Sequence, residues 1–87
     1  MLSDKVIKAL PELTGYALKV LLALRHTANK GRNKSFVTMR AREIQEISGL
    51  EHRSYVVFGA KNLEEQGIVI KENCGNQGIR YILLDDC

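Results

Sequence analysis

The sequence predicts a small α+β domain, mainly α-helical, with a three-helix core, a short strand before the second helix and a C-terminal β-hairpin. Three observations favour this fold class. Apolar residues recur at helical spacing early in the chain, a glycine follows each of two amphipathic segments in the middle, and two β-prone runs enclose a Gly/Asn-rich connection at the end. The length fits one domain, 1–87, in which residues 1–10 are interpreted as an N-terminal extension or a dimerisation segment.

The first helix is predicted to run from Pro11 to about Ala28, because proline suits the first turn of a helix. Its apolar residues repeat at intervals of three and four, which places them on one face that packs in the core. These residues are Leu13, Tyr16, Ala17, Val20, Leu21 and Leu24. The preceding segment, residues 2–10, also has helical spacing, but it is short and ends at Pro11.

A loop, a strand and a second helix are predicted next. Residues 29–35 are polar and contain a glycine, which indicates a loop, and Phe36–Met39 is a short β-prone run. The second helix is expected over Ala41–Ser48, with Ile44 and Ile47 facing the core.

The ends of the second helix carry separate signals. Gly49 follows the helix at the position where a left-handed C-terminal cap is common. Arg40 precedes it where serine or threonine is usual, so we expect Thr38 to cap the N-terminus. Leu50–His52 then forms a tight turn.

The third helix is predicted over about 53–66 and is stopped by Gly67. Its core face consists of Val56, Gly59, Ala60 and Leu63. A glycine inside a helix costs about 1 kcal/mol relative to alanine, so we expect Gly59 to be there because another helix approaches closely.

The chain ends on a predicted hairpin. Residues 68–72 and 79–84 are β-prone, and they flank the Gly/Asn-rich connection 73–78. The earlier strand, Phe36–Met39, can add to this hairpin and complete a three-stranded sheet.

The formal net charge is +3, and the basic residues are concentrated in the middle of the chain. From Arg25 to Lys61 there are eight basic and three acidic residues, a balance of 8 − 3 = +5. The basic residues are Arg25, Lys30, Arg32, Lys34, Arg40, Arg42, Arg53 and Lys61. The compensating acids lie toward the C-terminal end, at Glu64, Glu65, Glu72, Asp85 and Asp86. This distribution suits a polyanion-binding face, although a run of charge alone is also typical of a solvated surface.

Several classes of protein are disfavoured. No apolar run approaches the roughly 20 residues of a membrane-spanning helix, and the start lacks a signal-peptide pattern, so a cytoplasmic protein is expected. Cys74 and Cys87 have no neighbours at ligand spacing, so we expect reduced thiols and neither a disulfide framework, a metal nor a cofactor. No catalytic constellation is recognisable, and Asp85 and Asp86 on a strand would point opposite ways. We therefore do not expect an enzyme.

The order and lengths of these elements are those of a winged helix-turn-helix domain. Arg42–Leu50 (REIQEISGL), followed by Ala60–Ile68 (AKNLEEQGI), resembles the winged-helix pattern of bacterial and phage regulators and replication initiators. Leu13–Leu24 is similar to the opening helix of phage replication-protein N-terminal domains. The resemblance implies sequence-specific binding of double-stranded DNA through a recognition helix at about 53–66 and a wing at 68–84. It implies a transcription regulator, or a replication or maintenance factor of a phage, plasmid or similar element.

Candidate DNA contacts lie at the start of the second helix, in the turn, on the outward face of the third helix and in the wing. They are Arg40, Arg42, His52, Arg53, Ser54, Tyr55, Lys61, Lys71, Asn76, Gln77 and Arg80. Arginine can pair bidentately with guanine, serine and tyrosine can bond bases or phosphates, and a helix N-terminus attracts phosphate. Phe58 also points outward, and although a contact with a thymine methyl is an alternative, we favour packing against the wing or a second subunit.

Two other partners remain open. Winged helices also serve as docking domains, and outward Val57 and Phe58 would suit a protein–protein interaction module without DNA binding. RNA or single-stranded DNA is a narrower alternative, but the few aromatic residues do not form a stacking platform. A homodimer on a two-fold site is expected, because the apolar residues in 2–10 exceed what a small core needs. No small-molecule substrate or membrane partner is evident.

Overall fold

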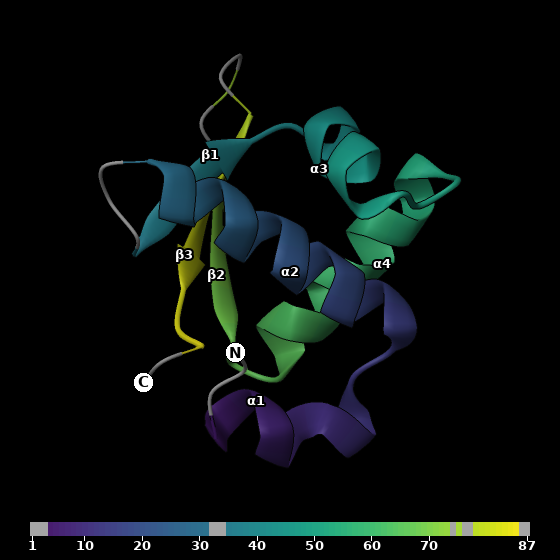
Figure 1. Cartoon of the computed structure of the whole chain (residues 1–87), viewed down its shortest axis with the longest axis vertical. Coiled ribbons are helices and arrows are strands. Elements are labelled where there is room, and N and C mark those ends of the chain that lie inside the picture. The colour runs from purple at the N-terminus through teal and green to yellow at the C-terminus, as the bar shows by residue number, and fades with distance from the viewer. Residues whose placement is uncertain (1–3, 32–34, 74, 76–77, 86–87) are drawn as a thin grey trace.

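The computed structural model describes residues 4–31, 35–73, 75 and 78–85. The fold is α+β and mainly helical (Figure 1). In chain order the elements are α1 (Asp4–Ala9), a 3₁₀ turn η1 (Leu10–Glu12), α2 (Gly15–Lys30), β1 (Phe36–Met39), α3 (Ala41–Ser48), α4 (Arg53–Glu65), β2 (Val69–Asn73) and β3 (Ile79–Leu83). Within these described residues no helix is both long and apolar enough to cross a membrane.

The three strands form one antiparallel sheet in the order β1-β3-β2. The predicted addition of the early strand to the C-terminal hairpin is therefore confirmed. Side chains alternate across the sheet, and one face is buried against the helices. The buried residues of that face are Val37, Met39, Val69, Tyr81 and Leu83.

The long N-terminal helix begins later than the sequence predicts. Pro11 lies in the 3₁₀ turn, and α2 starts at Gly15 after an extended residue at Leu13. The side chain of Thr14 caps α2 by accepting a hydrogen bond from the Ala17 N–H at 3.1 Å. Asn62 of α4 stabilises this break, because its side chain accepts the Thr14 N–H at 2.9 Å and donates to the Glu12 carbonyl at 3.2 Å.

Helices α2 and α4 form the central contact of the fold, and they approach most closely at Gly59. A Cβ atom placed there would lie 2.7 Å from the Tyr16 carbonyl oxygen and 2.9 Å from Val20 Cγ2. The expectation that Gly59 permits a close helix approach is thus confirmed. Figure 1 shows α2 crossing in front of α4 and the sheet.

Two expectations about α3 are wrong. Ile44 is buried, but the Ile47 side chain is 47% exposed, because it borders an open hollow between α2 and α3 instead of packing in the core. Thr38 does not cap α3: it is an exposed residue of β1, and Arg40 occupies the N-cap position. The Glu43 carboxylate accepts the Arg40 N–H at 3.1 Å instead, which satisfies a backbone donor at this end.

The N-terminal helix α1 is partly integrated into the domain. Val6 is fully buried with the core residues of α2 and α4. Ile7 and Leu10, in contrast, are exposed. Residues 4–10 therefore pack on the core through Val6 and, partly, Ala9, and leave Ile7 and Leu10 largely exposed.

Candidate nucleic-acid interface

Helices α3 and α4 are joined by a four-residue turn, residues 49–52, that sets their relative orientation. Gly49 adopts the left-handed conformation (φ 75°), which glycine tolerates best, and its N–H donates to the Gln45 carbonyl at 3.0 Å. Leu50 is buried, and the Gln45 side-chain amide donates to the Glu51 carbonyl at 3.1 Å. The turn is thus held by both packing and hydrogen bonds, so α4 starts from a defined position.

Helix α4 has one buried face and one exposed face. Its buried residues are the predicted set of Val56, Gly59, Ala60 and Leu63. The residues exposed along its first two thirds are Arg53, Ser54, Val57, Phe58 and Lys61. The Phe58 side chain is 58% exposed.

Charge is distributed unevenly along α4. Its only carboxylates are Glu64 and Glu65 at the C-terminal end, whereas Arg53 and Lys61 lie in the first two thirds. Arg53, Val57 and Lys61 follow one another at four-residue intervals, which places them on one stripe of the helix. Neither cation forms an ion pair with another described residue. The exposed face of α4 therefore presents two available positive charges that flank an apolar centre.

Three aromatic rings gather where α4 begins. Tyr55 stacks on Tyr16 of α2 with ring centroids 4.4 Å apart and planes 7° from parallel. The His52 ring meets Tyr55 edge-on at 5.1 Å. The neighbouring Tyr16 hydroxyl, and to a lesser degree desolvation, raise the pKa of Tyr55 above its ordinary value of 10.0. The Tyr55 ring is thus held by Tyr16 on one face and contacted by His52, so these three rings fix one another at the start of α4.

The start of α3 carries the predicted cations Arg40 and Arg42, and both are exposed. Arg42 forms a solvent-exposed pair with Glu46 one turn later, with Nε and Oε1 3.4 Å apart. Because Glu43 already binds the backbone at this helix end, a phosphate arriving there would meet a carboxylate as well as two arginines.

The hairpin separates its two described cations. Arg80 lies on the exposed face of the sheet, with its guanidinium 5.1 Å from the centre of the Phe36 ring and opposite Glu72 in register. Lys71 pairs with Tyr81, which follows Arg80 in β3. Because successive side chains of a strand alternate between the two faces, Lys71 lies on the face opposite to that of Arg80. Asn76 and Gln77 lie outside the described residues, as do Arg32, Lys34, Asp86 and both cysteines.

One cation of the basic middle is not available to a partner. Arg25 binds Asp85, the most buried charged residue described, and the Arg25 Nε–Asp85 Oδ2 distance is 3.1 Å. The pair joins α2 to the segment after β3, sixty positions further along the chain. The sequence-based separation of a basic middle from an acidic end therefore does not hold for these two residues in space.

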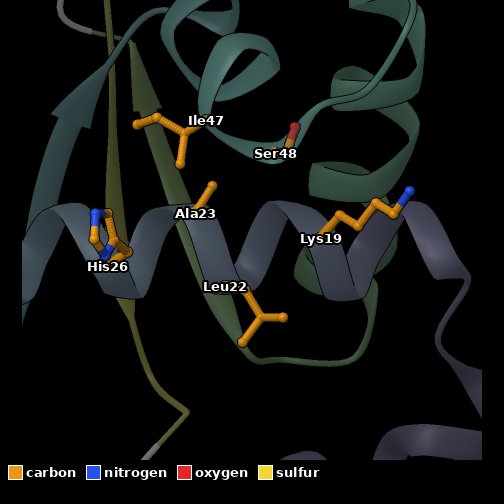
Figure 2. Close-up of a pocket in the computed structure, with 6 residues that line it drawn as sticks. All are labelled: Lys19, Leu22, Ala23, His26, Ile47 and Ser48. Carbon is orange, nitrogen blue, oxygen red and sulfur yellow. The ribbon is translucent and has the colours of Figure 1, made fainter.

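A hollow lies between α2 and α3 (Figure 2). It is an open depression of about 400 Å³ with Lys19 at one end, His26 at the other and apolar side chains between them. Its lining consists of Lys19, Leu22, Ala23, His26, Ile47 and Ser48. The described residues contain no cluster of three His, Cys, Asp or Glu side chains that could hold a metal ion. None of the candidate DNA contacts lines this hollow.

Sequence reasoning missed two residues that shape the interface. Tyr16 was assigned to the core, but it is 38% exposed and holds Tyr55 in a stack. Asn62 connects α4 to the start of α2 through two hydrogen bonds. Their partners lie 39 to 50 positions away in the chain, so no local pattern indicates either role.

No protein-family model matches this chain, and no curated protein is significantly similar to it.

Proposed function

We propose that the chain is a winged helix-turn-helix domain that binds double-stranded DNA, with α4 as the recognition helix and the β2–β3 hairpin as the wing. The observation that carries the proposal is the exposed face of α4. Its cations Arg53 and Lys61 have no ion-pair partner among the described residues, and its carboxylates are confined to the last two positions.

The dimensions of the helix support this proposal. The major groove of B-DNA is about 12 Å wide and admits an α-helix. Helix α4 has 13 residues, so it is about 20 Å long. Its buried face is fixed on α2 at Gly59, and its other face is free to approach the edges of base pairs.

Each candidate residue has a role in this proposal. Arg53 and Ser54, in the first turn of α4, contact base edges or phosphates, and Lys61 contacts a phosphate further along the groove. His52 and the Tyr55 hydroxyl lie beside them. Arg40 and Arg42 approach the backbone from α3, and the wing contributes Arg80, Lys71 or residues of its tip.

The proposed context is a cytoplasmic regulator, or a replication or maintenance factor of a mobile element, that binds its site as a homodimer. Ile7 of α1 and Leu10 of η1 are exposed apolar side chains available for contact between two copies. A two-fold DNA site would then have half-sites about 10 base pairs apart, or multiples of that spacing.

A second function has one observation in its favour. Val57 and Phe58 are 49% and 58% exposed at the centre of the α4 face, which suits docking on a protein surface. Salt separates the two functions. Protein binding releases counterions from the DNA phosphates, and this release is worth less at higher salt, so DNA affinity falls steeply as the salt concentration rises. A protein interface centred on apolar side chains depends far less on ionic strength.

The experiment is a fluorescence-anisotropy titration with a random 20-base-pair duplex at 50 and 200 mM salt, comparing the wild type with Arg53→Ala and Lys61→Ala. Both residues are exposed, so neither change should alter folding. Each lost phosphate contact should reduce the slope of log affinity against log salt by about 0.9. Lys8→Ala on α1 removes an equivalent exposed charge away from α4 and serves as the control.

Absence of binding at 50 mM salt would overturn the proposal. If Arg53→Ala, Lys61→Ala and Lys8→Ala reduced the DNA affinity equally, nonspecific charge attraction would explain the binding. This result would overturn the assignment of α4 as the recognition helix.

A further inference from the structure

The centre of the α4 face is apolar, although it lies between two cations. Val57 follows Arg53 by four residues and precedes Lys61 by four, and Phe58 is its exposed neighbour. About half of the Val57 side chain and more than half of the Phe58 side chain remain exposed. If α4 enters a groove between two phosphate backbones, Val57 and Phe58 lie at the centre of the face that meets the bases, with a cation one turn to either side of Val57.

The chemistry of the major groove limits what such side chains can read. Guanine, adenine and cytosine present hydrogen-bonding groups there, and an apolar side chain that displaces water from them leaves those groups unpaired. Thymine alone among the four standard bases adds an apolar group, its C5-methyl. 5-Methylcytosine presents the same methyl beside an amino group.

We propose that Val57 and Phe58 read C5-methyl groups of pyrimidines, so that the DNA site of this protein contains thymine or 5-methylcytosine under the middle of α4. The inference rests on the proposed function, because it assumes that α4 enters the groove. It assigns part of the sequence preference to the apolar pair, in addition to the roles proposed above for Arg53 and Lys61.

The position of the cations favours DNA over a protein as the occupant of this patch. A protein partner of the apolar pair would gain from Arg53 and Lys61 only if it placed carboxylates beside both of them. A duplex supplies negative charge on both sides of every groove, whatever its sequence.

The test begins with selection of the preferred site from a random duplex library by the full chain. Every thymine of the selected site is then replaced singly by deoxyuridine, which removes the methyl and keeps all hydrogen-bonding groups. At positions where uracil weakens binding, C·G and 5-methyl-C·G pairs are compared to distinguish a reader of thymine from a reader of the methyl alone.

We expect one or two positions at which uracil weakens binding about fourfold each, the factor for burying one methyl-sized group. At these positions Val57→Ala or Phe58→Ala should bring the thymine-to-uracil ratio close to one. Leu22→Ala is the matched control: this side chain is 56% exposed on α2, beside α3, and its loss should leave the ratio unchanged.

Three outcomes overturn the inference while the proposed function stands. The selected site contains no methyl-sensitive position, the sensitive positions do not respond to Val57→Ala or Phe58→Ala, or salt-dependent binding occurs without any selected sequence. Absence of DNA binding in the titration above removes the proposed function and this inference together.

Discussion

Replacing Gly59 by alanine tests the central packing of the fold and the position of α4. The added Cβ would lie 2.7 Å from the Tyr16 carbonyl oxygen, 2.8 Å from the Tyr16 carbonyl carbon and 2.9 Å from Val20 Cγ2. Ordinary contact requires 3.4 Å, so the helices must separate by about 0.7 Å. Two of the three atoms belong to the backbone of α2, and they cannot move aside by a side-chain rotation.

Two effects of opposite sign determine the magnitude. Alanine is favoured over glycine inside a helix by up to about 1 kcal/mol. Overpacking a well-packed core costs about 1–3 kcal/mol, and a rigid backbone neighbour places this site near the upper end. We therefore expect Gly59→Ala to lower the free energy of unfolding by about 2 kcal/mol and the melting temperature by about 8–16 °C.

The assay is urea and thermal unfolding followed by circular dichroism, with Gly15→Ala as the control. Gly15 is the first residue of α2, and a Cβ there meets nothing within 4 Å, so this variant should be as stable as the wild type or slightly more stable. A Gly59→Ala variant that is at least as stable as the wild type would refute the close approach of α2 and α4.

Two further predictions concern a buried ion pair and a buried tyrosine. Asp85→Ala should destabilise the protein by about 3 kcal/mol, because it leaves the largely buried Arg25 guanidinium without this partner. Glu46→Ala breaks the exposed pair with Arg42 and should cost less than about 1 kcal/mol in the same urea assay. Similar losses in the two variants would contradict the structural importance of the buried pair. Burial raises the pKa of Tyr81 above its ordinary value of 10.0. Above about pH 10 the Tyr81 hydroxyl therefore loses its proton more readily in the unfolded chain than in the folded one, so the free energy of unfolding falls as the pH rises. Urea unfolding at pH 9 and 11 should show a smaller loss for Tyr81→Phe than for the wild type, and equal losses would show that Tyr81 is not the group responsible.

The order of the elements from α2 to β3 was predicted by the sequence alone, because its signals are local. Helical periodicity placed the core face of α4 correctly, and the glycine after Ser48 marked the end of α3. The β-prone runs around the Gly/Asn-rich segment likewise indicated β2 and β3. Such patterns depend on residues within one or two turns of each other, so they are readable without the fold.

The tertiary structure decided the features that depend on partners distant in the chain. Asn62 fixes the start of α2 from 48 positions away, and Asp85 neutralises Arg25 across 60 positions. The exposure of Ile47 depends on the open hollow left between α2 and α3, and the stacking of Tyr55 depends on Tyr16 arriving from another helix. Composition and spacing contain the residue types for these contacts, but only the folded backbone brings the partners to within hydrogen-bonding or van der Waals distance.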